Sequence, residues 1–296
     1  MAIPEAQLDV WSAQGSVTQS KNTYASLKAV LEDPASPYHA KSFTILLQGS
    51  YGNDTNVYAD SDVDLVIRLD STFNYSLENL SEMAKTDFDS AFANVEYGYA
   101  DFKKDVLSWL FTKYGSAVHP GNKALYVAGN GNRRDADVLP CVSFRKYRKF
   151  NSMNDQDYVE GICFFFPDGT RIINYPRQHS DNLTWKHQQT GGWLKPAVRI
   201  LKNMRNRMVN DGVIEEGLAP SYYLEGMLYN VPTDLFGTTY AHTLTHALAW
   251  LAKTDRSKLV CANEQYYLLW KDTRTSWDPD KCELFLDRVL DFWNNW

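Results

Sequence analysis

Two short apolar segments joined by a polar, turn-rich stretch constrain the fold of this chain more than any other feature. Residues 43–48 form the first segment. Residues 63–69 form the second, with Val63, Leu65 and Ile67 alternating along it. A period of two is typical of a strand that has one side in a core. Residues 49–59 between the segments are rich in Gly, Asn and Asp, the residues that favour turns. The sequence therefore predicts two strands of one sheet, connected by a loop.

The remaining hydrophobic pattern predicts a mixed first part and a helical second part. Helices are expected over residues 16–31 and 101–114, strands over residues 125–128, 137–144, 161–166 and 170–174, and a polar excursion over residues 71–86. The turn Pro167-Asp168-Gly169 predicts a hairpin between the last two strands. Helices are then expected over residues 195–208, 220–229, 242–252 and 278–296. We predict an α+β fold of two lobes: a mixed-sheet lobe with a long N-terminal helix over residues 1–180, and a helical lobe over residues 181–296.

Asp62 and Asp64 stand at the start of the second strand. Alternate residues of a strand share a face, so both carboxylates point the same way while Val63 and Leu65 enter the core. Adjacent carboxylates repel, and a divalent cation relieves that repulsion. Mg²⁺ prefers such oxygen ligands and shares its other positions with phosphate. Gly49-Ser50 adds a glycine that allows close backbone approach, and a hydroxyl that can bind phosphate.

A third carboxylate is expected from a later strand. Asp135 and Asp137 both precede the apolar run that starts at Val138. We favour Asp137 because it leads directly into that run, and Asp135 is then a turn or strand-edge residue.

Composition limits the partners of the chain. The formal net charge is −6, which argues against a long nucleic acid because its binders usually carry a basic face. The four cysteines form no C-x-x-C pair, which argues against a zinc ribbon and favours a reducing cytoplasm. We find neither a signal-peptide pattern nor an apolar run as long as a membrane span. A cytoplasmic protein with no membrane partner is expected.

Motifs spread along the chain resemble one family of enzymes. These are residues 48–56 (QGSYGNDTN), 60–64 (DSDVD), 174–176 (NYP), 219–222 (APSY) and 228–232 (LYNVP). They are similar to the bacterial cGAS/DncV-like nucleotidyltransferases, and to the CdnE branch, which includes the cyclic UMP-AMP synthases. The resemblance implies a two-lobed polymerase β-like fold whose helical lobe closes the nucleotide cleft. It further implies Mg²⁺-dependent synthesis of a cyclic dinucleotide from two ribonucleoside triphosphates, with two ions bound and Mn²⁺ as a substitute. The implied setting is cyclic-oligonucleotide-based antiphage signalling (CBASS), with a downstream effector that senses the product.

The resemblance also assigns roles to individual residues. Asp62, Asp64 and Asp137 correspond to the catalytic, metal-binding triad. Nucleotide binding falls to six residues: Gln48, Gly49, Ser50, Lys202, Ser221 and Tyr222. Among these, Lys202 and Ser221 reach the triphosphate and Tyr222 stacks on a base. The residues alone leave two alternatives open, because Lys202 lies in a run of basic residues and Tyr223 follows Tyr222.

Asn174 is the candidate for base selection. Its amide offers an acceptor and a donor, which match the N3–H and O4 edge of uracil. The alternative is an asparagine that caps the turn before Tyr175-Pro176. The uridine-using members have an asparagine at this place, so the resemblance favours ATP and UTP as substrates. Cyclic UMP-AMP is then the first expectation for the product, and cyclic di-UMP the second.

Other functions remain as alternatives. A linear nucleotidyltransferase and a catalytically silent nucleotide sensor use the same fold, although a silent protein has no need of three repelling carboxylates. His242 and His246 have the i, i+4 spacing of a metal pair, but no acidic residue stands beside them, which favours packing. The basic cluster 145–149 is interpreted as a solvated strand end.

Overall fold

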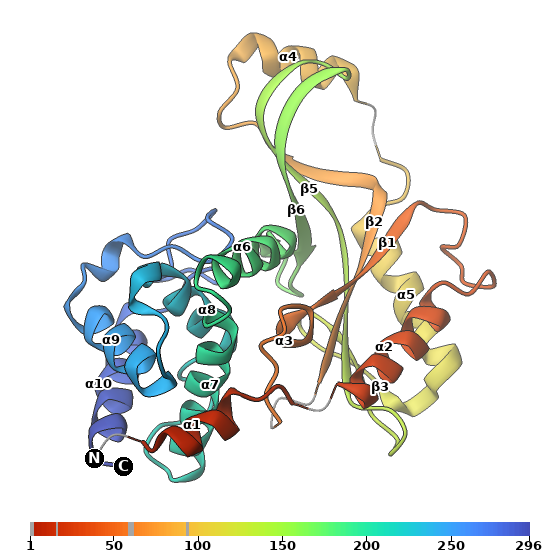
Figure 1. Cartoon of the computed structure of the whole chain (residues 1–296). Coiled ribbons are helices and arrows are strands. Elements are labelled where there is room, and N and C mark those ends of the chain that lie inside the picture. Colours follow the sequence, from red (N-terminus) through yellow and green to blue (C-terminus); the bar gives the residue numbers. More distant parts are fainter. Residues whose placement is uncertain (1–2, 16, 59–61, 93–94) are drawn as a thin grey trace. The chain divides into compact units, whose positions relative to one another are not determined.

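The computed structural model describes residues 3–15, 17–58, 62–92 and 95–296 (Figure 1). Contacts divide the chain into two compact units. The sheet unit comprises Thr18–Gln48 and Asp62–Tyr175, and the helical unit comprises Met1–Val17, Gly49–Ser61 and Pro176–Trp296. This division differs from a single boundary at residue 180, because the N-terminal segment and the loop after the first strand group with the C-terminal helices.

A seven-stranded mixed sheet is the centre of the sheet unit. Its strands are β1 (Phe43–Gln48), β2 (Val63–Ser76), β3 (Val118–Pro120), β4 (Leu125–Val127), β5 (Ala136–Ser152), β6 (Asp155–Phe165) and β7 (Arg171–Asn174). The order is β1-β2-β5-β4-β3, and the far part of β5 pairs with β6, which pairs with β7. Only β2 and β5 pair in parallel, and the other pairs are antiparallel. The predicted mixed sheet is confirmed.

Three helices accompany this sheet: α2 (Thr18–Leu31), α4 (Glu82–Ala91) and α5 (Tyr99–Tyr114). Helices α2 and α5 pack against each other, and Figure 1 shows α4 beside the distal ends of β5 and β6. Phe88 of α4 is buried with Tyr147 and Phe150 of β5, so this end of the sheet has a small aromatic core of its own.

The helical unit is built around α7 (Leu194–Asn210), which contacts each other α-helix of the unit that is longer than one turn. Its other helices are α1 (Glu5–Ser12), α3 (Gly49–Gly52), α6 (Pro176–Gln189), α8 (Ser221–Asn230), α9 (Tyr240–Lys253) and α10 (Pro279–Asn294). Nine residues of α7 are buried, including both the apolar Ile200 and the charged Lys202. The start of α10 is fixed by Asp278, whose carboxylate accepts from the backbone N–H groups of Asp280 and Lys281.

The structure corrects several predicted elements. Residues 71–86 contain regular structure and are not only a polar loop. β2 passes a register shift after Leu69 and then pairs Phe73–Ser76 with β5, and α4 begins at Glu82. Helices α1 and α6 were not expected, since α1 buries only Leu8 and α6 only His179 and Leu183. The predicted helix start at Ser16 and the loop residues 59–61 lie outside the described residues.

Candidate active site

Strand register brings two of the predicted metal ligands together. Asp64 of β2 is paired with Asp137 of β5. Paired residues of neighbouring strands project to the same face, so both half-buried carboxylates line one side of the sheet. Asp62 is exposed and lies two residues before Asp64. The pKa of Tyr126 is raised, first by a hydrogen bond with Asp135, then by burial and by the negative charges of Asp135, Asp62 and Asp137.

Asp135 and Asp137 have different surroundings. The Asp135 carboxylate accepts a hydrogen bond from the backbone N–H of Gly129 at 2.7 Å, and its carbonyl accepts from Val63 N–H at 3.0 Å. These contacts hold the turn before β5 against β2. The Asp135 carboxylate thus has a structural partner in this turn, which favours Asp137 as the metal ligand, and that choice stays a prediction.

The residues at this position fit a divalent metal by their chemistry. Asp62, Asp64 and Asp137 would supply carboxylate oxygens, the ligands that Mg²⁺ prefers. Among the described residues, no group of three or more His, Cys, Asp or Glu side chains is already arranged to hold an ion. The pairing of Asp64 with Asp137 thus provides the donor type in the right place, without a complete set of ligands.

The Gly49-Ser50 segment forms a tight turn after β1. Gly49 has φ +70°, a left-handed conformation that glycine adopts at little cost, and residues Gly49–Gly52 make the single turn α3. The backbone N–H of Asn53 donates to the Gly49 carbonyl at 3.2 Å, and that of Thr55 donates to the Ser50 carbonyl at 2.9 Å. Gln48, the last residue of β1, is the register partner of Asp64.

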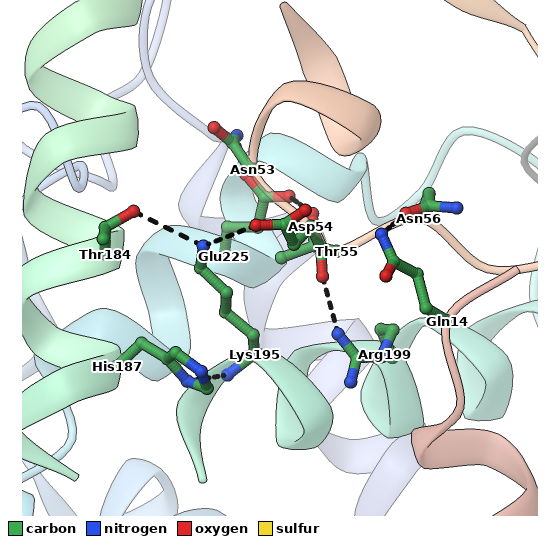
Figure 2. A network of polar contacts seen from close by, with 10 residues as sticks. All are labelled: Gln14, Asn53, Asp54, Thr55, Asn56, Thr184, His187, Lys195, Arg199 and Glu225. Carbon is green, nitrogen blue, oxygen red and sulfur yellow. Dashed lines mark hydrogen bonds and ion pairs between the residues drawn. The ribbon is translucent and has the colours of Figure 1, made fainter. Parts of the chain in front are cut away.

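Residues 53–56, which we call the anchor loop, are held by side chains of the helical unit (Figure 2). Lys195 Nζ lies 3.1 Å from Asp54 Oδ2, and Arg199 donates to the Asp54 carbonyl at 2.6 Å. Gln14 donates to Asn56 Oδ1 at 2.7 Å. Asp54 has φ +56°, a region that aspartate tolerates better than most residues. The contacts to its carboxylate and carbonyl offset the cost of that conformation.

Glu225 of α8 is the buried acceptor beneath the anchor loop. Only 3% of its surface is exposed. One carboxylate oxygen accepts from the Thr55 hydroxyl, and the other accepts from Asn53 Nδ2 at 3.2 Å and contacts His179 Nε2 at 2.7 Å. Burial by itself raises the pKa of Glu225, but His179, Lys202 and Thr55 together lower it. Glu225 is therefore held as a carboxylate in the interior.

The predicted nucleotide-binding residues of the helices also lie in this region. Lys202 is fully buried and donates to the Thr55 carbonyl at 3.0 Å. An ammonium has three N–H donors, so this bond alone does not exclude a triphosphate contact. Ser221 is the first residue of α8, and its hydroxyl accepts from Arg205 at 3.2 Å. The role of each in nucleotide binding stays a prediction.

The structure separates the two adjacent tyrosines. Tyr222 stacks on His179, with ring centroids 4.6 Å apart, and its hydroxyl accepts from Asn263 Nδ2 at 2.9 Å. Burial raises the pKa of Tyr222 well above the range in which it could ionise. Tyr223 stacks instead on Trp277. One face of the Tyr222 ring is thus already covered by His179, and base stacking would use its other face.

Asn174 ends β7 beside the antiparallel strand β6, where Ile162 is its register partner. Its Oδ1 accepts from the backbone N–H of Tyr175 at 2.8 Å. That is the local cap considered as the alternative from the sequence. A carbonyl oxygen has a second lone pair, so this bond leaves the amide able to pair with a base edge.

Sequence reasoning missed Glu225, His179 and Lys195. A signal for Glu225 is present, since it is the one charge in the apolar helix 221–230 and follows Ser221 by one helical turn. A charge inside an apolar stretch indicates a buried, partnered group. His179 lies in a polar stretch, whereas Lys195 stands beside apolar residues at a position that we interpreted only as the start of a helix.

The two signals that were discounted have structural explanations. The rings of His242 and His246 lie 4.0 Å apart, and no third ligand joins them among the described residues. The basic cluster lies inside β5 and not at a strand end, because β5 continues to Ser152. Arg145 packs over the Phe73 ring, and Lys149 pairs with Asp155.

A mixed sheet with carboxylates on paired strands, a Gly-Ser turn after the neighbouring strand and a C-terminal set of helices defines a polymerase β-like nucleotidyltransferase. Comparisons with known proteins agree. The family model for the cGAS/DncV-like nucleotidyltransferase C-terminal helical domain matches residues 181–294. Among curated proteins, the cyclic UMP-AMP synthase of Rhodothermus marinus is 39% identical over all of this chain and 99% of its own length. The cyclic dipurine nucleotide synthase of Elizabethkingia meningoseptica is 35% identical over 84% of each chain.

A solved structure gives the same result. The Rhodothermus marinus CdnE c-UMP-AMP synthase with Apcpp and Upnpp superposes with a TM-score of 0.89 at 37% identity, covering 99% of this chain and 97% of the other. The chain belongs to the cGAS/DncV-like nucleotidyltransferases, within their CdnE group of cyclic nucleotide synthases. The predicted family, fold class and enzyme class are confirmed. Among the described residues, no helix has the length and apolar character needed to cross a membrane.

Proposed function

We propose that this enzyme joins ATP and UTP into cyclic UMP-AMP, with release of two pyrophosphates. The full-length similarity to the cyclic UMP-AMP synthase is the observation that carries the proposal. Cyclic di-UMP or another cyclic dinucleotide is the second candidate, because the cyclic dipurine nucleotide synthase is 35% identical to this chain and the cyclic dipyrimidine nucleotide synthase CdnE of Legionella pneumophila is 31% identical. A linear nucleotidyltransferase is the third.

Asp62, Asp64 and Asp137 would hold the metal in this mechanism, with two Mg²⁺ ions and Mn²⁺ as a possible replacement. Bound Mg²⁺ would activate the attacking hydroxyl and neutralise the leaving pyrophosphate. The register pairing of Asp64 with Asp137 supports this assignment. Ser50 and the Gly49 backbone bind phosphate, next to Gln48. Lys202 and Ser221 bind the triphosphate, and Tyr222 stacks on a base.

Asn174 selects uracil in this proposal. Its Oδ1 accepts the uracil N3–H while its Nδ2 donates to O4, and a base lacking that edge leaves the half-buried amide without its partner. Asn174→Ser cannot span the same edge, so we expect it to use ATP more readily and to raise the share of purine-only product.

The product assignment is tested with all four ribonucleoside triphosphates at equal concentration with Mg²⁺. Mass spectrometry identifies the products, and phosphatase treatment separates cyclic from linear ones because cyclic products have no terminal phosphate. Wild type should give phosphatase-resistant cyclic UMP-AMP, and the double variant Asp62→Asn with Asp64→Asn should give nothing. An enzyme that ignores UTP contradicts the base assignment, and phosphatase-sensitive product indicates linear transfer. An unchanged product ratio in Asn174→Ser returns Asn174 to a turn-capping role.

The cellular setting follows from the family. We propose that the cyclic product is a CBASS signal made in the cytoplasm and sensed by a downstream effector. Expression with phage challenge, comparing wild type with the double aspartate variant, tests that setting.

A further inference from the structure

Glu225 has no role in the mechanism described so far, yet its carboxylate collects the side chains of the anchor loop. The two loop residues that it binds are Asn53 and Thr55 (Figure 2). The backbone N–H groups of these same two residues donate to the carbonyls of Gly49 and Ser50. One buried carboxylate is thus connected to both residues of the phosphate-binding turn, through one intermediate residue in each case.

The anchor loop needs hydrogen-bond partners for its buried side chains. Asn53, Thr55 and Asn56 are buried polar residues, and buried polar groups cost free energy unless they are hydrogen-bonded. The Glu225 carboxylate accepts hydrogen bonds from the side chains of Asn53 and Thr55, and Lys202 donates to the Thr55 carbonyl. The arrangement is built around a charge, since charged acceptors make stronger hydrogen bonds than neutral ones.

We propose that Glu225 is a positioning residue, which fixes Gly49 and Ser50 in their nucleotide-binding conformation through Asn53 and Thr55. The proposal rests on the proposed role of Ser50 in binding phosphate. His179 is the supporting partner, because it contacts the same carboxylate oxygen as Asn53 does. The cluster also explains why the Gly-Ser turn groups with the helical unit although it directly follows a strand of the sheet unit.

Two substitutions remove the connection in different ways. Glu225→Gln replaces one acceptor oxygen by an NH₂ group that faces donors. Thr55→Val removes the hydroxyl and keeps the shape of the side chain, so it tests the same connection if Glu225→Gln does not fold. Thr55→Ser restores the hydroxyl. Val289→Ala, in the buried face of α10, is the control for loss of stability, because Val289 belongs to the core of the same unit.

Hydrogen exchange measures the positioning itself. We expect exchange of the Asn53 and Thr55 amides to become roughly tenfold faster in Glu225→Gln and Thr55→Val, since the loss of one hydrogen bond to a charged group permits local opening. Thr55→Ser and Val289→Ala should exchange at these two amides as wild type does. Unchanged exchange at both amides in both loosened variants would overturn the proposal, whatever the enzyme binds.

Kinetics measure the consequence for nucleotide use. Glu225→Gln and Thr55→Val should raise KM for the triphosphates about tenfold with a smaller change in kcat, and we expect the same of Ser50→Ala. In the Ser50→Ala background, Glu225→Gln should add little, because residues that act through one another are non-additive. Additive losses would overturn the proposal. Faster amide exchange together with a wild-type KM in Ser50→Ala would instead contradict the proposed function of Ser50.

Discussion

Asp135 and Asp137 lie two residues apart on the same chain segment, yet their surroundings differ. Asp135 directs its carboxylate to the Gly129 backbone, while Asp137 stands in register with Asp64. A carboxylate that is bound to a backbone N–H stabilises a turn, whereas one beside a second carboxylate attracts a cation. The strand register therefore favours Asp137 over Asp135 as the proposed metal ligand.

This difference predicts opposite results for one type of substitution. Asp137→Asn should abolish product formation and leave thermal stability unchanged or raised, because it removes one of two like charges. Asp135→Asn should keep product formation and lower the free energy of unfolding by about 1 kcal/mol, because it weakens the hydrogen bond to Gly129. Product assays and urea denaturation measure both. Loss of product in Asp135→Asn with normal stability would place Asp135 in the metal site.

At the residue scale, the acidic positions leave a clearer signal in the sequence than the buried polar ones do. Asp62, Asp64 and Asp137 are recognisable because they border apolar strands at fixed spacing. Glu225 and His179 meet only in the folded helical unit, since they lie 46 residues apart in the chain. Contacts between helices of that separation leave no periodic pattern in a sequence.

At the scale of elements, the connection between α6 and α7 shows how one titratable group can stabilise a helix start. His187, in the last turn of α6, accepts the backbone N–H of Lys195 through Nδ1 at 3.3 Å. Lys195 in turn binds Asp54 of the anchor loop. Burial, with Lys195 and Arg199 nearby, holds the pKa of His187 below its ordinary value of 6.5.

The lowered pKa predicts a pH dependence of stability. Above pH 6.5 His187 is neutral in both the folded and the unfolded chain, and its contribution is complete. As the pH falls below that value the unfolded chain takes up a proton first, so the free energy of unfolding decreases until the folded pKa is reached. His187→Gln should lose part of this decrease. Denaturation of both proteins across this range measures the difference, and parallel curves would contradict the role of His187.

Elements with strong periodicity were predicted closely, and the missed ones are short of apolar residues. β1 was predicted with its observed bounds, and α5, α7 and α10 within a few residues. The extension of β2 and the helix α4 were missed because their burial comes from aromatic contacts, such as that of Phe73 with Phe88, across distant segments. Polar helices such as α6 form because they cover a core, and their own sequence gives little sign of it.

At the scale of the whole molecule, charge separates this enzyme from those that bind nucleic-acid duplexes. The chain carries 30 basic and 36 acidic residues, a net charge of −6. Two residues of its basic cluster on β5 have partners within the chain, since Arg145 covers the Phe73 ring and Lys149 pairs with Asp155. A duplex needs many phosphate contacts for useful affinity, and each contact makes binding more sensitive to salt.

We therefore expect no activation by a long nucleic acid. Adding double-stranded DNA or RNA should leave the rate of cyclic dinucleotide synthesis unchanged, and a fluorescently labelled duplex should show no rise in anisotropy even at low salt. The physical reason is that a net negative surface repels the phosphate backbone, while a small triphosphate needs only the metal and a few local donors. Free Mg²⁺ must be held constant in both arms, because added polyphosphate otherwise withdraws the ion. Binding that weakens steeply with salt, together with faster product formation, would contradict this expectation and point to a basic face formed by an assembly of chains.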